Sequence, residues 1–148
     1  DVSFASGRFR EIIFPNGVRV IDDCYNANPV SFEDALEAFR SLSGSRKKIV
    51  VFADMLELGA EEERFHRELG EKIEGSGVDM AIGYGKLAGV SIDAAQDRMD
   101  AQHFESAVKA LTVLRKVLRP GDAVLFKGSR GMHVEEVLDG VRDLSFSS

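Results

Sequence analysis

Two short apolar runs constrain the fold of this sequence more than any other feature. Residues 48–53 read Lys-Ile-Val-Val-Phe-Ala, and residues 123–126 read Ala-Val-Leu-Phe. Continuous apolar character over so few residues is typical of strands buried on both faces of a parallel sheet. Polar residues and then a helical pattern follow each run, which predicts an α/β protein.

Helical and strand-like patterns alternate along the rest of the chain. The spacing of apolar residues predicts helices over about 31–42, 61–74, 86–95, 106–118 and 133–141, and further strands over 78–83 and 99–103. Pro29 opens the pattern of the first of these helices, and Ser31 with Asp34 three residues later fits a capping box at the helix start. The alternation predicts a mostly parallel sheet with helices on both faces, and the loops that follow the strands should meet at one edge.

The start of the chain has a different pattern. Two β-rich runs, at 8–14 and 18–22, are separated by Pro15-Asn16-Gly17. Asn-Gly between strands is a strong hairpin signal, because both residues tolerate the backbone conformation of a tight turn. We therefore expect an N-terminal β-hairpin within a single domain that spans residues 1–148.

Composition excludes several classes of function. The net charge of −6 argues against broad binding to nucleic acid or to anionic membranes, and no apolar run approaches the length of a membrane span. The single cysteine, Cys24, rules out an internal disulfide and is more consistent with a small packing residue than with a nucleophile. With no signal-peptide pattern in residues 1–10, we expect a cytoplasmic protein that acts as a monomer, without membrane insertion.

The first polar loop is the densest cluster of functional side-chain types. Asp22 and Asp23 end the second β-rich run, and Tyr25, Asn26 and Asn28 follow at once. The acids suit a pair of ribose hydroxyls, a metal ion or acid–base work, and the other three side chains add donors and acceptors that suit a nucleotide. The structural alternative is a solvated strand end with an aspartate that forms a turn.

A second loop is basic. Lys127-Gly128-Ser129-Arg130-Gly131 joins a predicted buried strand to the last predicted helix. Its glycines let the backbone approach a ligand, and its cations and hydroxyl suit a carboxylate or phosphate. An ordinary basic loop is the alternative, but the cations interrupt an otherwise acidic protein.

Other candidate residues give weaker signals. Asp54 follows a predicted buried strand and fits equally well a hydrogen bond to a neighbouring loop or a contact with substrate. His66 is expected to be a surface or helix-packing histidine, and His103 and His133 are taken as structural. No metal site is predicted. Residues 83–88 match GxGxxG/A only in form, and the chain lacks GxxxxGK[ST], so the phosphates of any ATP must be held elsewhere.

Taken together, three ordered motifs resemble the C-terminal domain of the Mur ligases. They are IDDCYNANPVSFEDAL at 21–36, VVFADMLELG at 50–59 with His66 downstream, and LFKGSRG at 125–131 with VEEVL after it. Arg8-Phe9 in the first run adds to the resemblance, which covers nearly the whole chain. Three residues depart from the family pattern: Cys24 replaces a usual serine, Ala53 a usual glycine, and His133 a residue that is often apolar.

The resemblance implies a Rossmann-like, three-layer α/β/α fold with about six strands and a role in cytoplasmic peptidoglycan precursor synthesis. Within the family the motifs are most similar to those of ligases that join D-alanyl-D-alanine to UDP-N-acetylmuramoyl-tripeptide. In such ATP-dependent, ADP-forming ligases, ATP phosphorylates the tripeptide carboxylate and the dipeptide amine attacks the acyl phosphate. The resemblance also implies that the UDP-binding domain and the central ATPase domain, which holds Mg²⁺ and the ATP phosphates, lie outside these 148 residues. The chain is therefore expected to bind its central domain as a partner and not to catalyse alone.

The resemblance also implies roles for individual residues. Asp23 would contact the ATP ribose, and Tyr25, Asn26 and Asn28 would line the nucleotide cleft. Catalytic and substrate-binding roles facing the incoming dipeptide would fall to Lys127, Ser129 and Arg130, with Asp54 as a further substrate contact. Donors fixed in this way would stabilise the negative charge that develops on a tetrahedral intermediate.

A signalling receiver domain is the rival interpretation. Receivers also place an acid pair after the first strand, an aspartate after a middle strand and a lysine after the last, as Asp22, Asp23, Asp54 and Lys127 do here. Against it, no further strand and helix fit between the acid pair and Asp54, and a glycine follows Lys127 where receivers have proline. A nucleotide-binding module without enzymatic activity is a third possibility.

Overall fold

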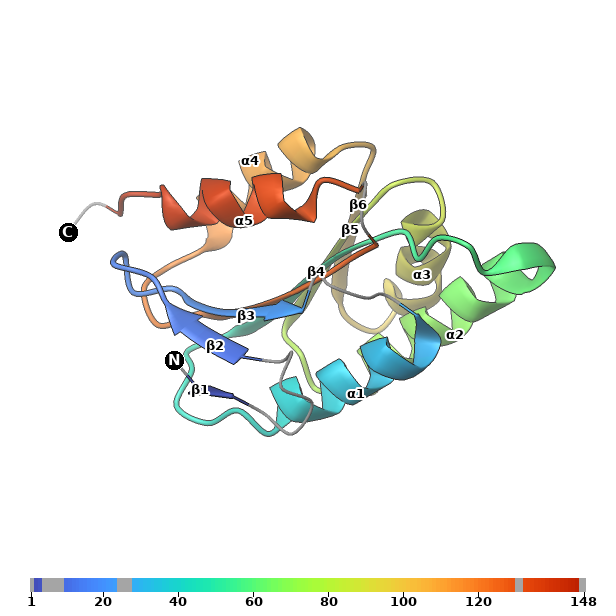
Figure 1. Cartoon of the computed structure of the whole chain (residues 1–148), viewed down its shortest axis with the longest axis horizontal. Coiled ribbons are helices and arrows are strands. Elements are labelled where there is room, and N and C mark those ends of the chain that lie inside the picture. Colours follow the sequence, from blue (N-terminus) through green and yellow to red (C-terminus); the bar gives the residue numbers. More distant parts are fainter. Residues whose placement is uncertain (1, 4–9, 24–27, 130–131, 147–148) are drawn as a thin grey trace.

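A single twisted sheet forms the middle layer of the computed structural model, which describes residues 2–3, 10–23, 28–129 and 132–146 (Figure 1). Its strand order is β1-β2-β3-β7-β4-β5-β6. The strands are β1 Val2–Ser3, β2 Arg10–Ile13, β3 Arg19–Asp23, β4 Lys48–Ala53, β5 Met80–Tyr84, β6 Asp100–Phe104 and β7 Ala123–Lys127. The five neighbouring strands β3, β7, β4, β5 and β6 are parallel. Strands β2 and β1 lie on the outer side of β3 and add antiparallel pairs. The predicted sheet is confirmed, with the two-residue β1 as an additional edge strand.

Helices cover both faces of the sheet. They are α1 Pro29–Arg40, α2 Glu62–Glu74, α3 Ala88–Ala95, α4 Ala107–Val117 and α5 Val134–Arg142, with a short 3₁₀ turn, η1 Gly59–Glu61, before α2. In Figure 1, α4 and α5 lie above the sheet while α1, α2 and α3 lie below it. The predicted three-layer α/β/α arrangement is therefore confirmed. In the part of the chain that the structure describes, no helix has both the length and the apolar character that a membrane span requires.

Alternation along the central strands divides the core into two halves. Val50 and Phe52 of β4 pack on the side of α1 and α2, where the rings of Phe32 and Phe52 meet edge to face at 5.7 Å. Ile49 and Val51 pack on the opposite side, against α4 and α5. Because β4 is buried on both faces, both sets of side chains must be apolar, and this explains the continuous apolar run in the sequence.

The predicted hairpin is present and is tied to the end of the chain. The Asn16 side chain accepts a hydrogen bond from the Val18 N–H at 3.0 Å and donates to the carbonyl oxygens of Val141 and Leu144, at 2.9 and 3.0 Å. Gly17 has a φ of 89°, a conformation that a glycine adopts without strain. One side chain thus fixes the hairpin turn and satisfies carbonyls at the C-terminal end of α5.

Helix α1 begins earlier than Ser31 and Asp34 suggested. The N-cap is Asn28, whose Oδ1 accepts from the Ser31 N–H at 2.9 Å, while Ser31 Oγ accepts from the Asn28 N–H at 3.1 Å. Pro29 then takes the first helical position, where its missing N–H costs nothing. The predicted Ser31–Asp34 capping box is therefore wrong, and Ser31 occupies the third position of the helix. This shift places Ser31 beside the carboxyl end of β7.

Candidate functional site

The loops with polar side chains meet at the carboxyl edge of the parallel strands. Asp23 at the end of β3 pairs with Lys127 at the end of β7, which lies beside Phe52 of β4. Tyr84 at the end of β5 pairs with Ala53. The predicted clustering at one edge is confirmed, and this edge is the candidate site.

Lys127 and Asp23 form an ion pair within this edge. Lys127 Nζ donates to Asp23 Oδ2 at 2.9 Å and to Ser31 Oγ at 3.2 Å. The Lys127 side chain is 0% exposed, whereas that of Asp23 is 12% exposed. A buried ammonium needs such acceptors around it, since an unpaired charge inside a protein is strongly disfavoured. The partner that reaches the surface is the carboxylate.

The two neighbouring aspartates do not share a face of the sheet. Ile21 packs toward α1, and Asp23, two residues later, lies on the same side beside Ser31. Val20 packs on the opposite side, and Asp22 follows it there because side chains alternate along a strand. The strand geometry thus separates two carboxylates that the sequence presents as a pair.

Asp54 holds a neighbouring loop. Its Oδ1 accepts a hydrogen bond from the Ala88 N–H at 2.7 Å, at the start of α3, and the residue is buried. Of the two roles that the sequence leaves open for Asp54, the link to a neighbouring loop is observed. Direct contact with substrate stays a prediction.

The glycines of the GxGxxG-like segment serve packing. A Cβ on Gly83 would lie 2.8 Å from the Phe52 ring, and one on Gly85 would lie 2.6 Å from Asp54 Oδ1. Gly85 also has a φ of 106°. These glycines let β5 and the start of α3 approach β4 closely, so the motif has a structural explanation.

The segment after β4 is held from two sides. On one side, His66 Nε2 accepts from the Met55 N–H at 3.0 Å, and Nδ1 lies 2.7 Å from Glu62 O. The only neutral tautomer that fits both contacts carries its proton on Nδ1. On the other side, Ser129 Oγ accepts from the Leu56 N–H at 3.0 Å. The fully buried His66 is therefore a packing histidine, and its contact with the segment after β4 could not be predicted from local sequence patterns.

The remaining candidates differ in what the structure describes. Tyr25, Asn26 and Arg130 lie outside the described residues. Asn28 is the N-cap of α1, and its side-chain oxygen accepts the Ser31 N–H described above. A contact that sequence reasoning missed is Tyr84, whose hydroxyl donates to Met132 O at 2.5 Å. It links the end of β5 to the segment before α5.

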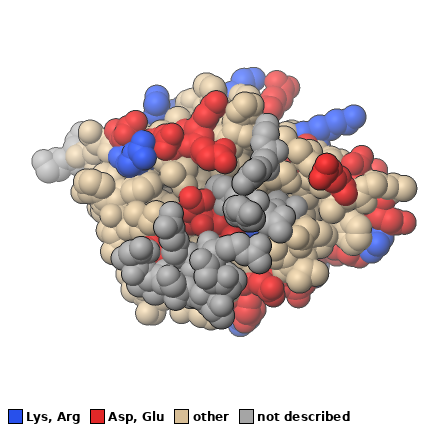
Figure 2. All heavy atoms as spheres, viewed as in Figure 1, with Lys and Arg blue, Asp and Glu red and all other residues tan. Residues whose placement is uncertain are grey.

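The protein surface is mainly acidic on the face that Figure 2 presents. Figure 2 shows many red acidic side chains and fewer blue basic ones on the face that it presents, in line with the net charge of −6. Lys127 adds no charge to the surface, because its side chain is fully buried. The charge that this pair presents outward is negative, which suits hydroxyl donors such as those of a sugar.

Comparison with known proteins identifies the family. Residues 7–130 match the family model described as "Mur ligase, glutamate ligase domain". The chain belongs to this family. Among relatives, it is 38% identical over 132 residues to the UDP-N-acetylmuramoyl-tripeptide–D-alanyl-D-alanine ligase of Bacillus subtilis, a match that covers 87% of the chain and 28% of the relative. It is 30% identical over 139 residues to the ligase of the same name from Escherichia coli, covering 93% of the chain and 30% of the relative.

Solved structures of Mur ligases share its fold. MurF from Thermotoga maritima, crystallised in complex with ADP, superposes with a TM-score of 0.77 at 30% identity, over 95% of this chain and 31% of that one. A MurF structure from Acinetobacter baumannii superposes with a TM-score of 0.82 at 28% identity, over 92% of this chain and 30% of that one. The Mur ligase chain thus spans about a third of the length of the proteins it matches, and its fold is that of a MurF C-terminal domain.

Proposed function

We propose that this chain is the C-terminal domain of an ATP-dependent ligase that joins D-alanyl-D-alanine to UDP-N-acetylmuramoyl-tripeptide. The observation that carries the proposal is the similarity of nearly the whole chain to ligases of that name. The carboxyl edge supports it, because Asp23, Lys127 and Ser129 lie there together on neighbouring strands and loops. The natural partners are then the two substrates and the other domains of the ligase.

The proposed reaction has two steps. ATP transfers its γ-phosphoryl group to the terminal carboxylate of the tripeptide, which gives an acyl phosphate and ADP. The amine of the dipeptide then attacks the acyl carbon, the C–O bond to phosphate breaks, and an amide and inorganic phosphate are released with loss of the amine proton. Closing this domain over the reactants would orient the amine and exclude water.

The residues of this chain fit the nucleotide sugar on one side. The Asp23 carboxylate is partly accessible at the edge of the sheet, at 12% exposed, and Lys127 holds one of its oxygens, Oδ2. A carboxylate fixed in this way accepts hydrogen bonds from ribose hydroxyls without further ordering. Tyr25, Asn26 and Asn28 complete the nucleotide side of the proposal. The ATP phosphates and Mg²⁺ are assigned to the central domain.

On the other side, Ser129 and Arg130 are proposed to face the dipeptide, with Asp54 nearby. Ser129 Oγ already fixes the segment after β4 through the Leu56 N–H. A guanidinium at position 130 would bind the dipeptide carboxylate through two parallel hydrogen bonds. The proposal therefore divides the edge into a nucleotide side and a dipeptide side.

The test is a ligation assay on the full-length gene product that carries this chain. We expect the protein to form the amide and release ADP only when ATP, Mg²⁺, the UDP-linked tripeptide and D-alanyl-D-alanine are all present. Chromatography of the reaction product measures the amide. ATP binding without turnover would instead support a nucleotide-binding module without enzymatic activity. The receiver interpretation has no support from the comparisons, and labelling of Asp54 by acetyl phosphate would be the result in its favour.

A further inference from the structure

Lys127 contacts both ends of the first polar loop. Its Nζ lies 2.9 Å from Asp23 Oδ2, immediately before residues 24–27, and 3.2 Å from Ser31 Oγ, shortly after them. Ser31 in turn forms the capping box with Asn28, the residue at which α1 begins. One buried ammonium therefore joins the last residue of β3 to the first turn of α1.

The register of the sheet makes this contact specific. Asp23 and Lys127 are direct partners in the parallel pairing of β3 with β7, so their side chains leave the sheet side by side on the α1 face. The lysine side chain is 0% exposed, and the carboxylate lies between it and the surface at 12% exposed. A ligand at this edge meets the carboxylate before it meets the ammonium.

Resting on the function proposed above, we infer that Lys127 is a positioning residue for the nucleotide side of the site. It holds the Asp23 carboxylate and the first turn of α1 in place for the ATP ribose, and it does not touch the dipeptide. For the dipeptide role predicted from the sequence, this fully buried Nζ would have to move away from Asp23 Oδ2 and Ser31 Oγ toward the surface, which would leave the Asp23 carboxylate without this cation. The buried ion pair disfavours that movement.

Steady-state kinetics of the full-length gene product separates the two roles. Lys127→Met removes the charge and keeps most of the side-chain volume. We expect the KM for ATP to rise about tenfold, the effect of losing a hydrogen bond to a charged group, while the KM for D-alanyl-D-alanine changes less than about twofold.

Lys48→Met is the matched control, because Lys48 is the first residue of β4, at the opposite edge, and its Nζ donates only to Arg40 O among the described contacts. This variant should leave both KM values unchanged.

A double-mutant cycle shows whether Lys127 acts through Asp23. Asp23→Asn alone should raise the KM for ATP, and adding Lys127→Met should then change it by less than about twofold, because coupled residues are not additive. Should Lys127→Met fail to fold, Ser31→Ala removes one of the ammonium's acceptors and should shift the KM for ATP in the same direction by a smaller factor.

Two results would overturn the inference. One is a raised KM for the dipeptide with an unchanged KM for ATP in Lys127→Met, and the other is full additivity of the two substitutions. Absence of ligation by the unsubstituted protein would refute the proposed function instead. In that case the affinity for ATP is measured by calorimetric titration of the same variants. An ATP affinity of Lys127→Met equal to that of the unsubstituted protein would count against the positioning role of Lys127.

Discussion

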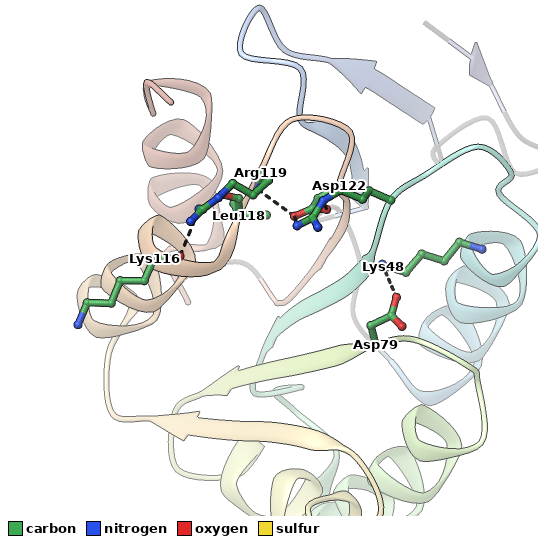
Figure 3. Close-up of polar contacts among 7 residues, drawn as sticks. Lys48, Asp79, Lys116, Leu118, Arg119 and Asp122 are labelled. Carbon is green, nitrogen blue, oxygen red and sulfur yellow. Dashed lines mark hydrogen bonds and ion pairs between the residues drawn. The ribbon is translucent and has the colours of Figure 1, made fainter. Parts of the chain in front are cut away.

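Each of the two ends of the parallel strands has an ion pair with one fully buried partner, but the buried partner is an acid at one end and a cation at the other. At the amino edge, buried Asp122 accepts from Arg46 Nε at 2.9 Å and from the Arg119 N–H at 2.9 Å, while the Arg46 side chain is 50% exposed (Figure 3). At the carboxyl edge the cation, Lys127, is buried and Asp23 reaches the surface. The amino edge therefore presents a cation outward, and the carboxyl edge presents an acid.

The partners of the two pairs also differ in kind. Around Asp122, the contacts fix where strands begin: its carbonyl accepts from the Arg19 N–H at 2.8 Å, and nearby Asp79 accepts from the Lys48 N–H at 2.8 Å. Figure 3 shows the Asp79 contact with Lys48 and the Asp122 contact with Arg119 near the starts of the strands. Around Lys127, the contacts lead instead into the loop after β3 and the first turn of α1. We therefore expect the pair at the strand starts to serve stability and the pair beside the loop after β3 to serve the proposed function.

Asp122→Ala should have the largest effect on stability. It leaves the Arg119 N–H without its acceptor and removes a two-point contact with Arg46, so we expect a loss of about 2–3 kcal/mol in the free energy of unfolding. Urea denaturation of the chain measures this loss, and the KM for ATP of the full-length gene product should stay unchanged. A rise in the KM for ATP as large as that of Asp23→Asn would contradict the assignment of stability to the amino edge and function to the carboxyl edge.

His66→Ala should come next, because it affects both the core and the site. The substitution leaves the buried Met55 N–H without an acceptor and opens a cavity, for an expected loss of about 2 kcal/mol. Because the same segment contacts Ser129, kcat should fall as well. The control is His103→Ala, whose exposed ring makes one described hydrogen bond, to Gly85 O, and should cost less than about 1 kcal/mol. Equal losses for the two histidines would contradict the role given to His66.

Ser129→Ala should have the smallest effect on stability. It removes one exposed hydrogen bond, to the Leu56 N–H, and we expect a loss of about 0.5–1 kcal/mol. Its kinetic effect should fall on the dipeptide, with a raised KM for D-alanyl-D-alanine and an unchanged KM for ATP. A raised KM for ATP with an unchanged KM for D-alanyl-D-alanine would instead place Ser129 on the nucleotide side. The proposed division of the carboxyl edge into a nucleotide side and a dipeptide side would then be wrong.

The elements of the fold could be predicted because their signals are local. The run at 48–53 matches β4 residue for residue, and Asn16-Gly17 marked the hairpin. At α1 the local signals were divided. Pro29 correctly marked the opening of the helix, but Ser31 with Asp34 suggested a capping box, whereas the N-cap is Asn28. Two valid caps three residues apart compete, and the choice between them depends on packing that the sequence does not display.

The direction of each side chain at the site could not be predicted in the same way. The Lys127–Asp23 contact joins residues 104 positions apart and depends on the register between β3 and β7. Asp54 likewise finds its partner, the Ala88 N–H, 34 positions along the chain. The sequence identified which residues gather at the edge, whereas tertiary pairing decides which of them face a ligand and which face each other.

The hydrogen bonds from Asn16 to the end of α5 have a consequence for how the hairpin is attached to the domain. The Asn16 side chain joins the hairpin to the end of the final helix through contacts with three carbonyl oxygens, those of Val141, Arg142 and Leu144. The Gly121 N–H, in the turn that precedes β7, donates to Gly17 O at 2.9 Å. The hairpin turn, the last turn of α5 and the turn before β7 are therefore held together directly by hydrogen bonds. These anchor points lie at the amino ends of β3 and β7, so the hairpin turn is fixed to the domain at the end opposite the candidate site.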